Sequence, residues 1–207
     1  QYIFKGIPYA KPPIDELRWM PTVPYTTEKT ALAAQSFKPA CMQDNGNTDW
    51  YRAVAISLGN PISMVHDKPI ISEDCLYLNV FSGDDNLNAN LPVMVWFHGG
   101  GNTAGHGGPL IFEGSNLASR GAVVVTANYR LGAFGFLAHP ALTSESEQNS
   151  SGMYGILDQI EVLRWVQNNI ADFGGDPSRV TIFGQSAGGT DVCLIMSSPL
   201  SEGLVHG

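Results

Sequence analysis

Residues 179–188 read Arg-Val-Thr-Ile-Phe-Gly-Gln-Ser-Ala-Gly, the most informative segment of the chain. The run Arg179–Phe183 predicts a strand, and the apolar segment Val192–Met196 that follows is expected to belong to a helix. Ser186 therefore lies on a turn between a strand and a helix, with a glycine two residues away on each side. The glycines let neighbouring backbone pass close by, and the sharp turn holds the serine hydroxyl clear of the sheet edge. The stretch predicts Ser186 as a catalytic nucleophile.

A second glycine-rich segment, His98-Gly-Gly-Gly101, directly follows the run Leu91–Phe97. That run is apolar, β-branched and aromatic, which is typical of a strand buried on both faces. Attack on an ester places negative charge on the former carbonyl oxygen, so a site for this reaction needs N–H donors already in place. Segments of this type supply such donors, together with the residue after the nucleophile. We therefore expect an oxyanion hole formed by Gly100, Gly101 and Ala187. The alternative, a flexible glycine loop, is disfavoured by the strand before it.

The order of the remaining elements predicts an α/β fold with a parallel sheet covered on both faces. Another buried strand is predicted at Gly121–Ala127. Apolar residues then recur at spacings of three and four from Ile156 to Ile170, which indicates a helix. That helix is expected to end within Phe173–Pro177, because glycine followed by proline is a stop signal. Ligands of such sheets bind beyond the carboxyl ends of the strands, where both glycine-rich segments fall.

Several further motifs follow one another along the chain. They are Phe4–Pro13, Leu17–Trp19, Ser72–Val80, Asn128–Phe136, Trp165–Val166 and Asn169–Ile170, besides His98–Gly101, Phe173–Pro177 and the turn at Ser186. With these motifs in this order, the chain resembles the type-B carboxylesterase/lipase family, the cholinesterase-like α/β-hydrolases, over nearly its whole length. The resemblance implies the α/β-hydrolase fold, with a mostly parallel, mixed central sheet flanked by helices. It also implies hydrolysis of carboxylic esters through an acyl-enzyme intermediate.

An alternative from a different functional class is a catalytically inactive, cholinesterase-like adhesion or binding module. Such modules commonly lose the nucleophile or disrupt the turn that carries it. Ser186 and both flanking glycines are present here, which favours the enzyme.

The remaining members of a catalytic triad are expected outside this chain. In this fold the triad runs serine, then an acid, then histidine along the sequence. After Ser186 the acidic residues are Asp191 and Glu202, and the histidine is His206. Asp191 is expected in the helix that follows the turn, and the other two lie in the last six residues, so none is expected to return over the sheet edge. Residues 1–207 are therefore interpreted as the N-terminal part of a single hydrolase domain. The remainder is expected on a second chain of a nicked enzyme or in a part that was removed, and the isolated chain is expected to be inactive.

Cysteine usage points to an oxidising compartment. Cys41 and Cys75 flank a 33-residue segment. The resemblance implies that they form a disulfide, because family members bridge the cysteine of the Glu-Asp-Cys motif to one upstream. A disulfide indicates a secreted, extracellular or periplasmic protein. The alternative is two buried free thiols in a cytoplasmic esterase. Cys193 is expected to be a small core residue.

Composition narrows the possible partners. The net charge of −8 disfavours nucleic acid and anionic membranes. No apolar stretch approaches the roughly 20 residues of a membrane span. We expect a small-molecule ester as substrate, with no cofactor and no metal ion.

The resemblance also bears on two ion pairs of the scaffold and on the charge of the substrate. The resemblance implies buried scaffold pairs of Arg18 with Glu73 and of Arg130 with Asp158; a solvent-facing helix position is the alternative for Asp158. Gln185 stands where the family usually has Glu, which removes negative potential beside the serine. Ten residues before Cys75, cholinesterases carry the tryptophan that receives choline, and Val65 stands there instead. Both departures disfavour a cationic choline ester.

Overall fold

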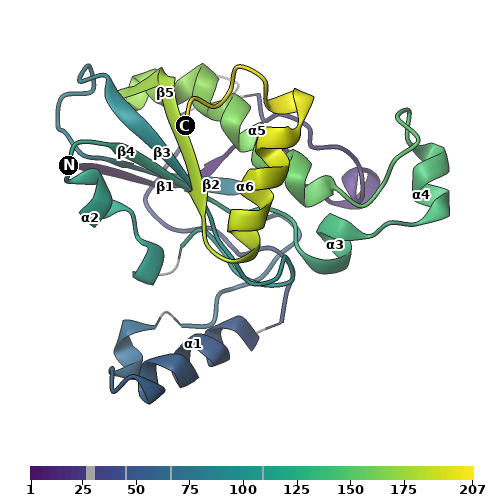
Figure 1. Cartoon of the computed structure of the whole chain (residues 1–207), viewed down its shortest axis with the longest axis horizontal. Coiled ribbons are helices and arrows are strands. Elements are labelled where there is room, and N and C mark those ends of the chain that lie inside the picture. Colours follow the sequence, from purple (N-terminus) through teal and green to yellow (C-terminus); the bar gives the residue numbers. More distant parts are fainter. Residues whose placement is uncertain (27–30, 45, 66, 109) are drawn as a thin grey trace.

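The computed structural model describes residues 1–26, 31–44, 46–65, 67–108 and 110–207. In this part of the chain five strands form one sheet in the order β1-β2-β4-β3-β5 (Figure 1). They are β1 (Tyr2–Pro8), β2 (Tyr77–Ser82), β3 (Leu91–Phe97), β4 (Val123–Ala127) and β5 (Gly175–Gly184). The pairs β1–β2 and β2–β4 are antiparallel, whereas β3 pairs with β4 and with β5 in parallel. Four strands therefore run in one direction and β2 runs against them, which confirms the mostly parallel, mixed sheet.

The described part of the chain contains the helices α1 (Gly46–Ser57), α2 (Ser115–Ala118), α3 (Gly132–Phe136), α4 (Pro140–Glu145), α5 (Tyr154–Asn169) and α6 (Ala187–Ser197). Of these, α2 packs on one face of the sheet, and α5 and α6 pack on the other. Alternate residues of β4 point to opposite faces: Val123 and Val125 join the main core with the apolar side chains of α5 and α6. Val124 packs instead with Phe81 and with Ala118 of α2. Because one strand serves both layers, β4 is buried throughout, as its continuous apolar run predicts.

The predicted elements are present, with shifted boundaries at two strands. Strand β4 begins two residues later than expected, because Gly121 and Ala122 donate their N–H groups to the Ala118 carbonyl and close the turn after α2. Strand β5 begins at Gly175, earlier than expected, because this residue already pairs with Leu91. The long helix α5 ends as predicted. A short 3-10 turn, Ile170–Phe173, leads into Gly174, which has a left-handed conformation with a φ of 84°.

The expectation that Cys193 is a core residue is wrong, because its side chain is exposed. The buried residues of α6 are Gly188, Asp191 and Ile195, spaced three and four apart on the face that packs against the sheet. Cys193 lies midway between the last two and therefore on the opposite face of the helix.

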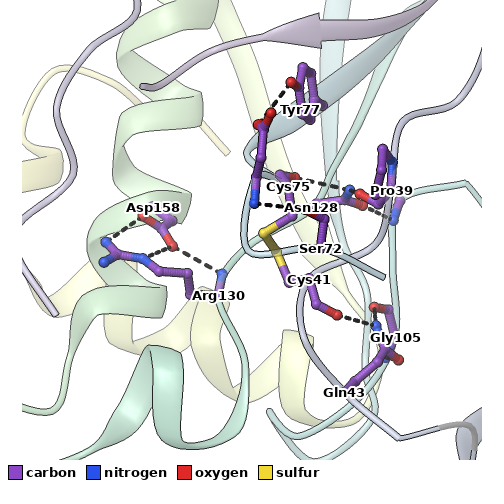
Figure 2. The surroundings of a disulfide bond; sticks show 12 residues. Pro39, Cys41, Gln43, Ser72, Cys75, Tyr77, Gly105, Asn128, Arg130 and Asp158 are labelled. Carbon is purple, nitrogen blue, oxygen red and sulfur yellow. Dashed lines mark hydrogen bonds and ion pairs between the residues drawn. A yellow bond between two sulfur atoms is a disulfide. The ribbon is translucent and has the colours of Figure 1, made fainter. Parts of the chain in front are cut away.

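Cys41 and Cys75 form the expected disulfide, with their Cα atoms 4.9 Å apart (Figure 2). The Cys75 carbonyl accepts a hydrogen bond from the Asn128 side chain, directly after β4. The Cys41 carbonyl accepts one from the side chain of Gln43. The bridge thus fastens the segment that carries α1, which projects from the body in Figure 1, to the start of β2.

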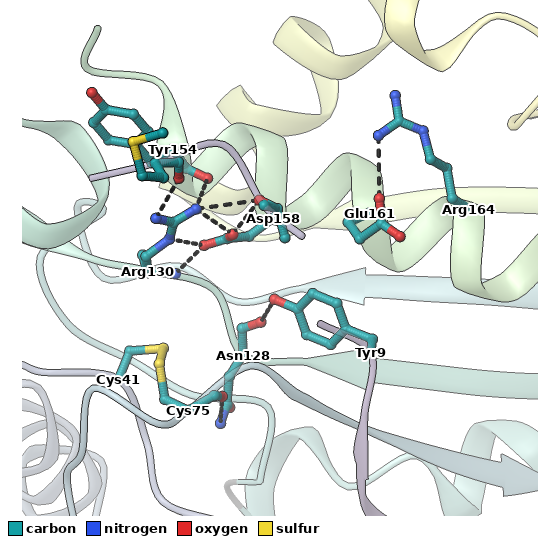
Figure 3. A network of polar contacts seen from close by, with 11 residues as sticks. Tyr9, Cys41, Cys75, Asn128, Arg130, Tyr154, Asp158, Glu161 and Arg164 are labelled. Carbon is teal, nitrogen blue, oxygen red and sulfur yellow. Dashed lines mark hydrogen bonds and ion pairs between the residues drawn. A yellow bond between two sulfur atoms is a disulfide. The ribbon is translucent and has the colours of Figure 1, made fainter. Parts of the chain in front are cut away.

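Both expected ion pairs form, but only one of them is buried. Arg130 and Asp158 are 2.8 Å apart, with side chains 3% and 0% exposed (Figure 3). This result rules out the solvent-facing alternative for Asp158. Arg18 and Glu73 make two short contacts, of 2.6 and 2.8 Å, yet their side chains are 34% and 24% exposed. The expectation of a buried pair is wrong here, because both residues lie on surface loops outside the helices and strands.

Candidate active site

Ser186 lies between the end of β5 and the first residue of α6, on a strained backbone. Its φ of 55° and ψ of −124° are a conformation that residues with a side chain rarely adopt. The flanking glycines allow this turn to close. A Cβ atom at Gly184 would lie 2.5 Å from the carbonyl of Gly188, closer than real contacts allow. In the described structure, Ser186 is exposed to solvent.

The turn packs directly against the end of β3. A Cβ at Gly188 would lie 2.2 Å from the Phe97 carbonyl oxygen and 2.6 Å from that of His98. A Cβ at Gly99 would lie 2.5 Å from the Gln185 carbonyl oxygen and 3.0 Å from the Cβ of Ser186. The absence of side chains at both positions therefore brings the segment His98–Gly101 alongside the serine.

The glycine loop continues past Gly99 in a conformation that only glycine adopts readily. Gly100 and Gly101 have φ values of 117° and 63°, in the region that favours glycine. The Gly100 carbonyl accepts the N–H groups of Thr103 and Ala104, both at 3.1 Å. Within the described ranges, the N–H groups of Gly100, Gly101 and Ala187 find no acceptor. For Ala187 this follows from its place as the first residue of α6, where backbone donors have no partner within the helix.

His98 is part of the packing that holds the loop in place. It is buried, and its ring stacks on that of Tyr129 with centroids 4.3 Å apart. Its Nδ1 lies 2.9 Å from the Gly99 carbonyl oxygen, and the Tyr129 hydroxyl donates to the His98 carbonyl at 2.6 Å. Burial lowers the pKa of His98 to about 4, so the ring is neutral at pH 7. Through these contacts His98 belongs to the scaffold of the loop, and in the described structure its ring forms no hydrogen bond with Ser186.

Two further side chains tie the loop down beyond the glycines. The Gly105 N–H donates to the Gln43 side-chain oxygen at 2.7 Å, and the Gln43 amide donates back to the Gly105 carbonyl at 2.7 Å (Figure 2). The Gly107 N–H donates to the Asn128 side-chain oxygen at 2.8 Å. Gln43 and Asn128 also contact the carbonyls of Cys41 and Cys75, so the disulfide region and the loop form one polar network.

Asp191 is buried in the first turns of α6, and the sequence analysis did not predict its contacts. One carboxylate oxygen accepts the Asn102 amide at 2.9 Å, and the other accepts the Gln159 amide of α5 at 2.7 Å. Burial raises the pKa of the Asp191 carboxyl, and the two amide hydrogen bonds oppose that shift. The available signal was an aspartate within an otherwise apolar helical segment and an asparagine directly after the glycine run.

The other two residues considered after the serine lie elsewhere. The His206 N–H donates to the Val180 carbonyl at 2.8 Å, and the Gly207 carbonyl accepts from Ile182, so the last residues run beside β5. The pairing with Val180 lies six positions before Ser186, about 13 Å back along the strand from Gly184 at the usual rise. Glu202 follows the turn Pro199–Ser201. In the described part of the chain, no histidine or carboxylate hydrogen-bonds to Ser186.

In the ranges that the structure describes, no group of three or more His, Cys, Asp or Glu residues is placed to hold a metal ion. Nor does any helix there combine the length and apolar character needed to cross a membrane.

A model of the carboxylesterase family matches residues 1–207. The chain belongs to the carboxylesterase family. Among its relatives is a fumonisin B1 esterase of Sphingopyxis macrogoltabida, 45% identical over 199 residues, which make up 96% of this chain and 34% of that protein. A cocaine esterase of Oryctolagus cuniculus is 43% identical, over 100% of this chain and 36% of its own length. The chain thus spans about a third of the length of these relatives.

Solved structures show the same fold. A thermophilic PNB esterase superposes with a TM-score of 0.83 at 40% identity, over 98% of this chain and 38% of that one. A carboxylesterase of Geobacillus stearothermophilus gives a TM-score of 0.82 at 38% identity, over 99% of this chain and 38% of its own. This family member therefore has the α/β-hydrolase fold of the esterases, over a chain that spans 38% of each of these two structures.

Proposed function

We propose that this chain is the nucleophile-bearing part of a serine carboxylesterase. The observation that carries the proposal is the juxtaposition of Ser186, on a strained turn, with a glycine loop in which the N–H groups of Gly100 and Gly101 have no acceptor in the described structure. A nucleophile needs an exposed hydroxyl, and the turn supplies one. Membership of the carboxylesterase family supports ester hydrolysis as the reaction.

In this mechanism the Ser186 Oγ bonds to the ester carbonyl carbon while its proton passes to a histidine base. The N–H groups of Gly100, Gly101 and Ala187 stabilise the oxyanion. The alcohol then leaves with the proton, and an acyl group remains on Ser186. Water attacks this acyl-enzyme and releases the carboxylic acid. Each oxyanion donor contributes roughly 3–4 kcal/mol to transition-state stabilisation, which is why the register of the glycine loop against the turn matters.

The histidine base and its acid partner are proposed to come from residues outside these 207. Support comes from the contacts of the candidates within them: Asp191 is held by two amides, His206 pairs with β5, and His98 is buried and neutral. A C-terminal part of the same hydrolase, on a second chain or on a continuing polypeptide, would supply both groups. Residues 1–207 alone are accordingly proposed to be inactive.

The substrate is proposed to be a small neutral carboxylic ester. Gln185 gives the site no negative charge next to the serine, and Val65 offers no aromatic face to a quaternary ammonium. The Cys41–Cys75 disulfide supports a secreted or periplasmic location. The alternative, an inactive adhesion module, is disfavoured because the relatives described above are named as esterases and because Ser186 is present.

The proposal is tested by labelling the full-length protein with an organophosphate and measuring the intact mass of every chain in the sample. We expect one adduct, on the peptide that contains Ser186, and no adduct on a Ser186→Ala variant. Residues 1–207 expressed alone should remain unlabelled under the same conditions. A full-length protein that stays unlabelled, or an adduct on another residue, would contradict the assignment.

A further inference from the structure

The loop that carries Gly100 and Gly101 is bound to the helix that carries Ala187 through one buried carboxylate. Asn102 directly follows the glycines, and its side-chain amide donates to Asp191 at 2.9 Å. Asp191 lies one helical turn after Ala187, on the face of α6 that packs against the sheet. Gln159 of α5 donates to the second oxygen of the same carboxylate at 2.7 Å. Asp191 therefore joins the loop, the helix after the serine and the layer beneath them.

A buried carboxylate in this position lowers the stability of the fold. Its side chain is fully buried, and within the described ranges it forms no ion pair. The groups around it are neutral: the two amides, and the Tyr129 hydroxyl, which lies 3.4 Å from the Asn102 side-chain oxygen. Burying a carboxyl without a cation costs stability that an apolar residue at the same place would not. A residue that violates the packing rule at a candidate site indicates a functional constraint.

We propose that Asp191 is a positioning residue, which clamps the glycine loop to α6 and so sets the distance between the two halves of the oxyanion hole. This inference rests on the proposed ester hydrolysis. One half of the hole consists of the Gly100 and Gly101 donors on the loop, and the other is the Ala187 donor on the helix. Because Ala187 and Asp191 belong to the same rigid helix, a fixed Asn102–Asp191 contact fixes the loop donors relative to Ala187.

The backbone at Asn102 is shaped for this contact. Its φ of 57° is left-handed, a conformation that asparagine tolerates better than most residues. The Asn102 carbonyl accepts the Gly132 N–H at 2.7 Å, so the backbone is held while the side chain reaches α6. Loss of the Asp191 acceptor would leave the buried Gln159 amide and the half-buried Asn102 amide without their partner and free the loop to shift. A displacement of about 1 Å at a reacting centre can lower the rate about 100-fold.

A neutral amide should replace the carboxylate without breaking the clamp. The Gln159 side-chain oxygen is buried and has no partner in the described structure. If that amide rotates by half a turn, the oxygen can accept from an asparagine introduced by Asp191→Asn, whose own oxygen still accepts from Asn102. Asp191→Ala offers no such substitute. The clamp thus predicts opposite results for two substitutions that both remove the charge.

The test compares kcat and KM for a p-nitrophenyl ester in the full-length protein. We expect Asp191→Ala to lower kcat about 10- to 100-fold with little change in KM, and Asp191→Asn to retain most of the wild-type kcat. Asn102→Gly removes the amide from the loop side while preserving the left-handed backbone, and should lower kcat by a similar factor. The kcat of the double variant Asp191→Ala/Asn102→Gly should be little lower than that of either single variant, since both substitutions break the same contact. Glu161→Gln is the matched control, because Glu161 is a buried carboxylate of α5 that pairs with Arg164 and forms no hydrogen bond with the loop in the described structure.

Hydrogen exchange of the backbone amides of residues 99–104 provides a readout that does not require turnover. Exchange should accelerate in Asp191→Ala and Asn102→Gly and stay at the wild-type rate in Asp191→Asn and Glu161→Gln. Wild-type kcat together with wild-type exchange in Asp191→Ala and Asn102→Gly would overturn the inference, as would an Asp191→Asn variant as impaired as Asp191→Ala. If the wild-type protein hydrolyses no ester but exchange still accelerates, the clamp stands and the proposed function fails.

Discussion

At the scale of single residues, backbone shape rather than side-chain chemistry positions the candidate site. Ser186 occupies a conformation that costs of order 1–3 kcal/mol, and such strain persists only where the surroundings hold it. Gly188 provides that support, since it lies where β3 ends and leaves no room for a Cβ. The next residue, Gly189, has no such constraint: a Cβ there would meet the Gly184 carbonyl oxygen at an ordinary 3.4 Å.

The first prediction therefore contrasts these neighbouring glycines. Gly188→Ala should lower the free energy of unfolding by about 2–3 kcal/mol, because the new methyl group collides with the Phe97 and His98 carbonyls. Gly189→Ala should be neutral or stabilising by up to about 1 kcal/mol, because alanine is the better helix former. Urea unfolding of both variants measures the difference. Equal stability of the two variants would mean that the turn is not packed against β3 as described.

A second prediction concerns His98 and pH. Its pKa of about 4 in the folded protein lies below the unfolded value of about 6.5, so the unfolded chain binds the extra proton between these values. The contribution of His98 to stability is therefore complete above pH 6.5 and declines as the pH falls towards 4, by about 3 kcal/mol in all. In His98→Gln the stability difference from wild type should narrow over this window as the pH falls. A difference that is constant from pH 7 to pH 4 would refute the buried neutral ring.

At the scale of elements, α5 is held to the chain segment after β4 by one buried ion pair. Asp158 accepts from the Arg130 backbone N–H at 3.0 Å as well as from its guanidinium, and also from the Thr22 hydroxyl at 2.6 Å (Figure 3). The guanidinium donates in addition to the Met20 carbonyl at 2.9 Å. The N-terminal loop, the end of β4 and α5 thus meet at a single pair of charges.

The third prediction is that the two ion pairs differ in their contribution to stability. Asp158→Asn should destabilise the protein by about 3–5 kcal/mol, because it leaves the Arg130 charge buried and unpaired. Glu73→Gln should cost about 1 kcal/mol or less, since solvent reaches that pair. Denaturant midpoints of the two variants, measured side by side, provide the comparison. A larger loss for Glu73→Gln would contradict the burial that separates the two pairs.

At the scale of the whole molecule, the sheet and the meeting of the two glycine motifs were predictable, and the side-chain contacts between segments were not. Leu91–Phe97 is a strand as expected, and parallel pairing of β3 with β5 brings the ends of both strands together, so Ser186 meets the glycine loop. The Asn102–Asp191 bond joins residues 89 positions apart, and no local pattern specifies it. The exposure of Cys193 and the partial exposure of the Arg18–Glu73 pair likewise depend on how α6 and the surface loops dock, which periodicity does not encode.

The claim that Ser186 is the nucleophile is tested most directly by trapping the acyl-enzyme. The full-length protein is mixed with a p-nitrophenyl ester, quenched with acid within the first turnovers, and digested for peptide mass spectrometry. We expect the acyl group of the ester on Ser186 and no acylated peptide from Ser186→Ala. Rapid release of p-nitrophenol with Ser186 unmodified, or with the acyl group on another residue, would contradict it.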